Sequence, residues 1–129
     1  MTGRVRDTAE MIHGMAPELQ PGVFVFATVD AAPPEVIATM REAEGLSVIL
    51  PRDVARREDL PTDLPMRQIT LRVHSALDGV GLTAAVAAAL AGAGIACNMV
   101  AGHHHDHAFV PEDRADEAVT LLAQLAARA

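Results

Sequence analysis

The sequence predicts an α/β (α+β) fold in which helices lie on one face of an antiparallel sheet. In the second half of the chain, segments with strand character alternate with segments of helical periodicity. Half of the 129 residues are hydrophobic, so the chain can bury the core of one compact domain or of two very small ones. The acidic, proline-containing segment of residues 59–65 disfavours both a helix interior and a central strand, and we expect the chain to divide there.

The first half of the chain predicts short and irregular elements. We expect a helix over residues 8–15 with Asp7 as its N-cap, because Asp accepts hydrogen bonds from the first free N–H groups of a helix. Residues 23–29 are β-branched and aromatic, which indicates a buried strand. After a break at Pro33 and Pro34, we expect a hairpin of residues 37–41 and 46–50, and then a short helix over residues 53–58.

The second half predicts the element order β-α-β-β-α, one strand short of a split βαβ unit. Ile69, Leu71 and Val73 alternate with polar residues in a strand over residues 68–74, which indicates one covered face. A helix over residues 82–93, strands over 95–102 and 107–110, and a last helix after Asp113 follow. The missing strand could come from the other half of the chain.

Charge and composition exclude several classes of partner. The net charge is −7 and aromatic residues make up 2% of the chain, which argues against nucleic-acid binding. The longest apolar stretch, residues 82–94, is too short and too rich in Ala and Gly to span a membrane. The single cysteine, Cys97, cannot form an internal disulfide, so we expect a cytoplasmic protein.

Residues 79–84 (GVGLTA) match the pattern G-x-G-x-x-A between a strand and a helix. The following strand carries no acidic residue to hold a ribose, and about 45 residues remain after the motif, too few for a doubly wound sheet. We therefore predict no nucleotide or other cofactor. The motif is either a tight turn or a helix start whose N–H groups bind a small anion, such as an amino-acid carboxylate.

The run of residues 103–107 (HHHDH) offers imidazoles and a carboxylate that suit zinc or a similar metal. His103, His105 and His107 would share a face if this segment stayed extended, but a hairpin bend would break that alternation. A metal-binding protein or metalloenzyme using His103, His105, Asp106 and His107 is therefore the alternative to a site without metal.

Catalysis has little support in the sequence. Ser75 follows His74 on a strand, where neighbouring side chains point to opposite faces, and Cys97 lies in an apolar strand. Asn98, in the same apolar strand, needs hydrogen-bond partners, and either a nearby turn or a bound ligand would satisfy it. We predict no catalytic residues and no enzyme.

Residues 69–111 resemble ACT domains, which carry a strand, a glycine loop, a helix ending in "GI" and a strand with a polar residue such as Asn98. They are more closely similar to a bacterial family of small tandem ACT-like proteins with the motifs S-x-L-x-A-V-G-L-T and HDH-x-F-V-P. The first motif is matched at Ser75, Leu77, Val80, Gly81, Leu82 and Thr83, with Gly79 in place of Ala. The second is matched at His105, Asp106, His107, Phe109, Val110 and Pro111, and His103 and His104 replace the usual aromatics.

The resemblance covers residues 68–125 closely and residues 15–29 more weakly. It implies a ferredoxin-like βαββαβ fold in tandem, with residues 1–64 as a degenerate ACT-like half and residues 65–129 as an ACT-like domain. It also implies a regulatory, ligand-sensing role without catalysis, in which an amino acid binds at ACT–ACT interfaces. Exposed sheet edges and Ala-rich helices favour a homodimer.

We predict a ligand site where the loop of residues 75–83 faces Asn98 and the turn at Asp106. Backbone N–H groups near Gly81 would bind the carboxylate of an amino acid, and Asp78 or Asp106 would bind its ammonium group. The predicted ligand-binding residues are Ser75, Asp78, Gly81, Leu82, Thr83, Asn98 and Asp106. A third hypothesis is an assembly module without a ligand, in which a dimer interface covers the groove between Gly81 and Asn98.

Overall fold

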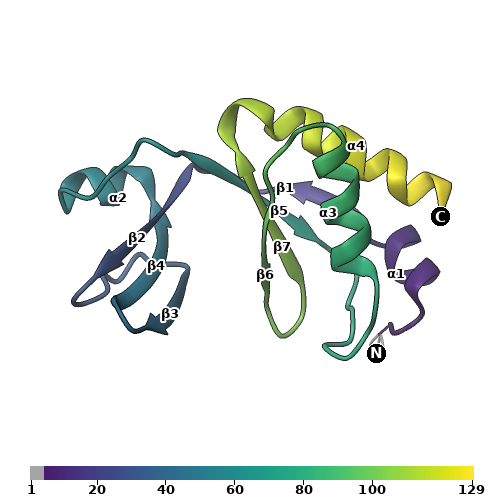
Figure 1. The fold of residues 1–129 in the computed structure, drawn as a ribbon, viewed down its shortest axis with the longest axis horizontal. Coiled ribbons are helices and arrows are strands. Elements are labelled where there is room, and N and C mark those ends of the chain that lie inside the picture. The colour runs from purple at the N-terminus through teal and green to yellow at the C-terminus, as the bar shows by residue number, and fades with distance from the viewer. Residues whose placement is uncertain (1–4) are drawn as a thin grey trace. The chain divides into compact units, whose positions relative to one another are not determined.

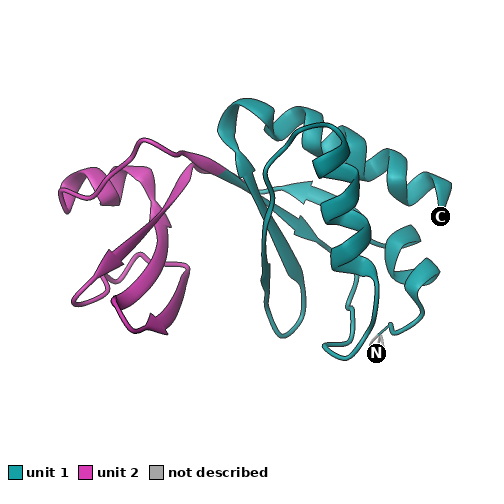
Figure 2. Cartoon of the chain, viewed as in Figure 1, with its two compact units in different colours: residues 1–20, 67–129 teal, residues 21–66 magenta. Residues whose placement is uncertain are grey.

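The computed structural model describes residues 5–129 (Figure 1). They divide into two compact units: Pro21–Met66 forms one, and Arg67–Ala129 with the described part of residues 1–20 forms the other (Figure 2). Each unit combines antiparallel strands with helices, which confirms the predicted α+β class. None of the helices in the described chain has both the length and the apolar character that crossing a membrane requires.

The unit formed by Pro21–Met66 is a three-stranded antiparallel sheet with one short helix. Its strands are β2 (Phe24–Val29), β3 (Ala38–Glu42) and β4 (Gly45–Pro51), in the order β3-β4-β2, and its helix is α2 (Arg52–Arg57). Val25, Val48 and Leu50 project from one sheet face and pack with residues of α2. The segment between β2 and β3 contains no helix, because Pro33 and Pro34 interrupt it. The unit therefore lacks the first helix of a βαββαβ pattern.

The other unit begins with α1 (Thr8–His13) and β1 (Pro17–Leu19). It continues with β5 (Met66–Leu71), α3 (Leu82–Gly92), β6 (Asn98–Ala101) and β7 (Asp106–Pro111), and ends with a 3₁₀ turn, η1 (Glu112–Arg114), and α4 (Ala115–Arg128). Its strand order is β1-β5-β7-β6, so β1 occupies the place of the last strand of a βαββαβ unit. The strand that the second half lacks thus comes from earlier in the chain.

Helices α1, α3 and α4 lie on one side of the strands of this unit (Figure 1). Ile69, Leu71 and Val73 are buried against them, as the alternation in the sequence predicts. The same cluster takes in residues of all three helices, of β7 and of the turn after α1: Met11, Met15, Leu82, Val86, Leu90, Ala108, Val110, Ala115, Ala118 and Leu122. The sheet and the helices therefore share one core.

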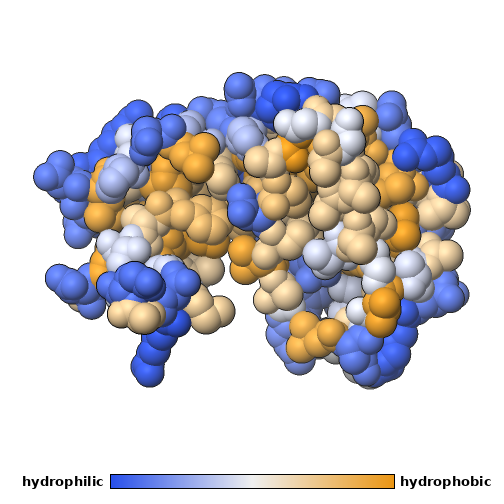
Figure 3. Space-filling model, viewed as in Figure 1, coloured by the Kyte–Doolittle hydropathy of each residue, from blue (hydrophilic) through white to orange (hydrophobic). Residues whose placement is uncertain are grey.

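Helix α3 is apolar over much of its surface because it is rich in alanine, whereas α4 carries its polar residues on one side. Ala84, Ala88 and Ala91 are exposed. Figure 3 shows the resulting pale apolar surface over α3. This exposed apolar helix surface is available for packing against another protein surface.

Several predicted boundaries shift in the structure. Asp7 caps α1 through a hydrogen bond from the Glu10 N–H, as expected. Asp113 lies inside η1 instead of capping α4, whose N-cap is Arg114 without a side-chain hydrogen bond. The strand expected over residues 95–102 pairs only from Asn98. The division into sequence halves at residues 64 and 65 stays a prediction, since packing groups residues by contact and not by repeat.

Candidate functional site

The loop between β5 and α3 ends at Gly81, the N-cap of α3. Its backbone is left-handed, with φ 109° and ψ −19°, a conformation that glycine adopts without a steric cost. No side chain caps the helix. The N–H groups in the first turn of α3 therefore have no capping side chain. The helix dipole stabilises an anion at this end of the helix.

A cleft of about 150 Å³ opens beside this helix start. It brings together five of the predicted ligand-binding residues: Ser75, Gly81, Leu82, Thr83 and Asp106. Five further residues, most of them apolar, complete the lining: Met11, Ala76, Leu77, Gly79 and Ala101. The cleft thus joins the glycine loop to the two residues that flank the bend of the β6–β7 hairpin.

Ser75 and Asp106 form the polar side of the cleft, and a hydrogen bond joins their side chains. The Ser75 hydroxyl donates to Asp106 Oδ2 over 3.0 Å. Ser75 is 9% exposed, so the bond is sheltered from bulk water. Of the lining residues in the described part of the chain, Asp106 alone is charged, which makes the cleft suited to a positively charged group.

Asp78 and Asn98 lie outside the cleft. The exposed Asp78 carboxylate accepts a hydrogen bond from Arg6 Nε over 3.0 Å, so it is already paired with a cation. Asn98 starts β6 opposite Phe109, and the cleft residue Ala101 lies three positions further along the strand. At about 3.3 Å per residue, this places the two Cα atoms roughly 10 Å apart. The structure therefore does not bring either residue to the cleft.

The histidine run forms the bend of the β6–β7 hairpin. The Gly102 N–H donates to the His105 carbonyl over 2.9 Å, which closes the turn and breaks the alternation of the side chains. The His105 ring contacts the His74 ring instead, with centroids 4.8 Å apart. Among residues 5–129, no group of three or more His, Cys, Asp or Glu side chains is arranged to hold a metal ion, so the metal alternative finds no support.

The His107 ring, unlike that of His105, faces β5. Its Nδ1 atom lies 3.1 Å from Gln68 Nε2 and 3.0 Å from Thr70 Oγ1. Since the amide nitrogen can only donate, Nδ1 acts as the acceptor and the ring is neutral. Burial lowers the pKa of His107 below its usual range, and the neighbouring His105 adds to the effect.

Met11 was not predicted as a site residue, and it lies more than sixty residues before the rest of the cleft. A methionine in a short helix normally signals a core position, and Met11 is indeed 1% exposed. No local pattern could have indicated that its helix packs beside the glycine loop. Burial raises the pKa of the Cys97 thiol, which disfavours the reactive thiolate.

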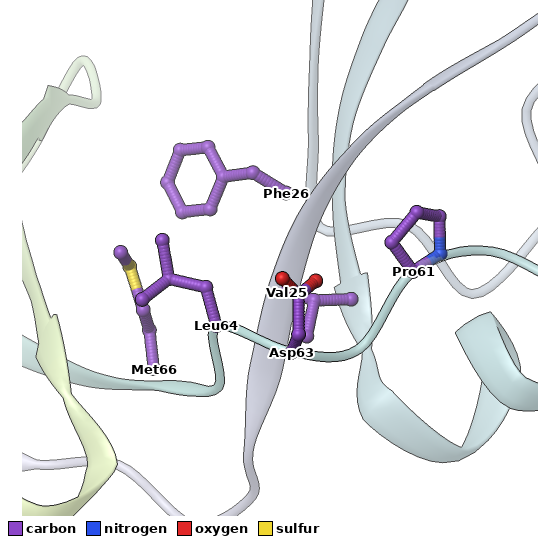
Figure 4. Close-up of a pocket in the computed structure, with 6 residues that line it drawn as sticks. All are labelled: Val25, Phe26, Pro61, Asp63, Leu64 and Met66. Carbon is purple, nitrogen blue, oxygen red and sulfur yellow. The ribbon is translucent and has the colours of Figure 1, made fainter.

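The unit formed by Pro21–Met66 has a smaller hollow, of about 60 Å³. Figure 4 shows Phe26, Leu64 and Met66 grouped on one side of this hollow, which also borders Asp63 and Pro61. It offers one carboxylate and no partner hydroxyl among its lining residues. The same unit has two wider hollows, of about 500 Å³ along residues 21–24 and 51–53 and of about 370 Å³ along residues 28–31 with 58 and 60. The cleft at Ser75 and Asp106 is the better candidate for binding a polar ligand, because it joins a hydrogen-bonded hydroxyl and carboxylate to the uncapped start of a helix.

Two family models of the ACT domain match the chain, over residues 5–67 and 64–124. A Vibrio cholerae protein of unknown function, described as a possible transport protein, has a solved structure that is 43% identical with a TM-score of 0.80. That match covers 89% of this chain and 92% of the other. No curated protein matches the chain.

Two more distant structures share the fold alone. A protein from Agrobacterium tumefaciens is 20% identical with a TM-score of 0.67, over 85% of this chain and 87% of its own. The regulatory subunit of aspartate kinase from Thermus flavus is 8% identical with a TM-score of 0.59, over 84% of this chain and 95% of its own. The two consecutive family matches and the 43% identical relative show that the chain belongs to the ACT-domain family and carries two ACT domains in tandem.

Proposed function

We propose that this protein is a non-catalytic sensor that binds a free amino acid in the cleft at the start of α3. The observation that carries this proposal is the juxtaposition of an anion-binding and a cation-binding group around one cleft. The uncapped start of α3 at Gly81, Leu82 and Thr83 suits a carboxylate, and Asp106 suits an ammonium group. These are the two charged groups that every free amino acid carries.

Of the two carboxylates predicted to bind the ammonium group, Asp106 is the better placed. Asp78 is exposed and paired with Arg6, so binding a ligand there would compete with an existing ion pair. Asp106 accepts one hydrogen bond from Ser75, and a carboxylate has acceptor capacity for more. We therefore assign the ammonium group to Asp106 and the orientation of its carboxylate to Ser75.

A screen of the standard amino acids at millimolar concentration by thermal shift, followed by calorimetry of any that respond, tests the proposal. Asp106→Asn keeps the shape and removes the charge, and should weaken binding by roughly tenfold to a hundredfold, since charge-assisted hydrogen bonds are worth about 1.5–3 kcal/mol. Asp116→Asn, at an exposed position of α4, is the matched control and should bind as the parent does. No response to any amino acid would overturn the proposal.

We further propose a cytoplasmic homodimer. The exposed alanines of α3 present apolar surface, and β6 lies at the edge of the sheet, and both features favour association. Light scattering on the purified protein would measure the mass directly. Ala88→Glu on the exposed side of α3 should shift a dimer of this kind toward monomer, whereas a dimer that persists unchanged would point to another surface.

A further inference from the structure

The segment of residues 5–11 lies along the loop that forms the ligand cleft. The Val5 backbone forms an isolated bridge with Ser75: its N–H donates to the His74 carbonyl over 2.7 Å, and its carbonyl accepts from the Ala76 N–H over 2.9 Å. Arg6 pairs with Asp78 next to this bridge. The segment is thereby attached to the same loop that carries the Ser75 hydroxyl of the cleft.

The two glycines of the loop lie where this segment approaches most closely. A Cβ atom at Gly81 would lie 2.6 Å from Thr8 Cγ2, and the Thr8 hydroxyl donates to the Val80 carbonyl. A Cβ atom at Gly79 would lie 3.0 Å from Met11 Sδ. The glycine motif is thus explained by close packing against α1 as well as by the left-handed backbone at Gly81.

Met11 extends this contact into the cleft itself. It is among the residues that line the cleft, and it is 1% exposed, so its side chain is held in place by its surroundings. Among the described residues that line the cleft there is no basic side chain to pair with an acidic side chain of a ligand. The cleft measures about 150 Å³, and the Met11 side chain at its wall takes up space that a larger ligand side chain would need.

We propose that residues 5–11 hold the loop of the cleft in place, and that Met11, which lines the cleft, restricts the ligand to an amino acid with a small neutral side chain. The inference rests on the proposed function, since it assumes that an amino acid binds here. Because one segment both lines the cleft and holds its loop, ligand binding and docking of the segment stabilise each other.

Calorimetry with glycine, alanine, serine, valine, leucine and phenylalanine tests the size restriction. The parent should prefer the smaller ligands, and Met11→Ala should shift the ratio of affinities at least tenfold toward leucine or phenylalanine. Met15→Ala is the matched control, because Met15 is 0% exposed in the same core but does not line the cleft. Met11→Val provides a milder enlargement in case the alanine variant does not fold.

Binding of the parent to an amino acid with an unchanged ranking in Met11→Ala and Met11→Val would overturn this inference and leave the proposed function standing. Binding of no amino acid by the parent or any variant would overturn both. A shift of the ranking in Met15→Ala equal to that in the Met11 variants would also count against a specific role of Met11.

Limited proteolysis with trypsin, which cleaves after Arg6, tests the docking of the segment independently. Gly81→Ala should speed this cleavage about tenfold, because the new methyl group collides with Thr8. Gly94→Ala is the control, since Gly94 also has a positive φ, of 72°, but no atom within 4 Å of the added Cβ. Thr8→Ser, which removes the colliding methyl, should restore part of the protection to Gly81→Ala. Equal cleavage of the Gly81 and Gly94 variants would overturn the proposed packing.

Discussion

His107 shows how one side chain ties the hairpin to the sheet and makes stability depend on pH. Its neutral ring accepts from Gln68, and burial lowers its pKa in the folded protein. Below about pH 6.5 the unfolded chain therefore takes up this proton before the folded chain does. We expect the free energy of unfolding to fall as the pH drops from about 6.5 through the lowered pKa. Above about pH 6.5 the neutral ring makes its full contribution to stability.

Denaturant unfolding at pH 7 and pH 5.5 would measure this loss, and His107→Gln should reduce it because glutamine does not titrate. NMR titration of the imidazole signals gives the pKa of His107 directly. A value at or above that of histidine in an unstructured peptide would contradict the prediction.

The Glu18–Arg72 pair links β1 to β5 with two hydrogen bonds of 2.8 Å each. The Arg72 guanidinium lowers the pKa of Glu18, so the pair stabilises the fold above the usual pKa of glutamate and this stabilisation is lost as the pH falls through the lowered value. Arg72→Gln should raise the pKa of Glu18, which NMR titration of its carboxyl carbon would report. Because both side chains are about half exposed, added salt should weaken the effect.

At the residue scale, the sequence predicted local chemistry better than distant contacts. Asp7 caps its helix because a cap needs only the next three residues. Ser75 and Asp106 do share a cleft, since the motifs that predicted them lie at the ends of elements that pack together. Asp78 was expected beside them, but Arg6 from another part of the chain pairs with it, and no local pattern carries that information.

At the scale of elements, two glycines at the end of α3 should respond oppositely to the same substitution. Gly92 lies in the helix with open space around an added Cβ, so Gly92→Ala should stabilise the protein by about 0.5–1 kcal/mol. Gly94 has a φ of 72°, where a side chain is strained, so Gly94→Ala should destabilise it by about 1–2 kcal/mol. Thermal unfolding of the two variants would distinguish them, and shifts of the same sign would contradict the prediction.

The longer elements were predicted from periodicity, because each buries one face over several turns or residues. Helix α3 and strands β2, β4 and β7 lie within one or two residues of their predicted bounds. Strand β1 was missed, since three residues with Pro17 at their start show neither alternation nor β-branched character. It forms because β5 has a free edge and the chain reaches it, which is a property of the fold and not of those residues.

At the scale of the whole molecule, the segment before Pro21 should be required for the later unit to fold. It supplies β1 to the sheet edge and Met11 and Met15 to the core. A truncated chain that begins at Pro21 should therefore lose the cooperative thermal transition of that unit, measured by circular dichroism. A peptide of residues 5–20 added in excess should restore part of it, whereas an unchanged transition in the truncated chain would show that the segment is dispensable.

The fold class and the tandem arrangement were predictable from pattern and resemblance, and the structure and the family matches confirm both. Which segment packs with which unit could not be predicted from the sequence. A strand has the same residue pattern whether it pairs with strands near it in the chain or with strands of a distant segment. We expected that the missing strand could come from the other half of the chain. Strand β1 takes this place, and its Leu19 pairs with Ile69 of β5.

The place of β1 also has a consequence for synthesis on the ribosome. Chains emerge from the N-terminus at roughly 5–20 residues per second, so Met11 and Met15 leave the ribosome several seconds before Leu122, with which they share a core. During that interval the segment Pro21–Met66 can fold around its own core. Met11 and Met15 meanwhile remain exposed apolar side chains. Residues made before the segment Pro21–Met66 thus reach their place in the core only after residues made much later have emerged.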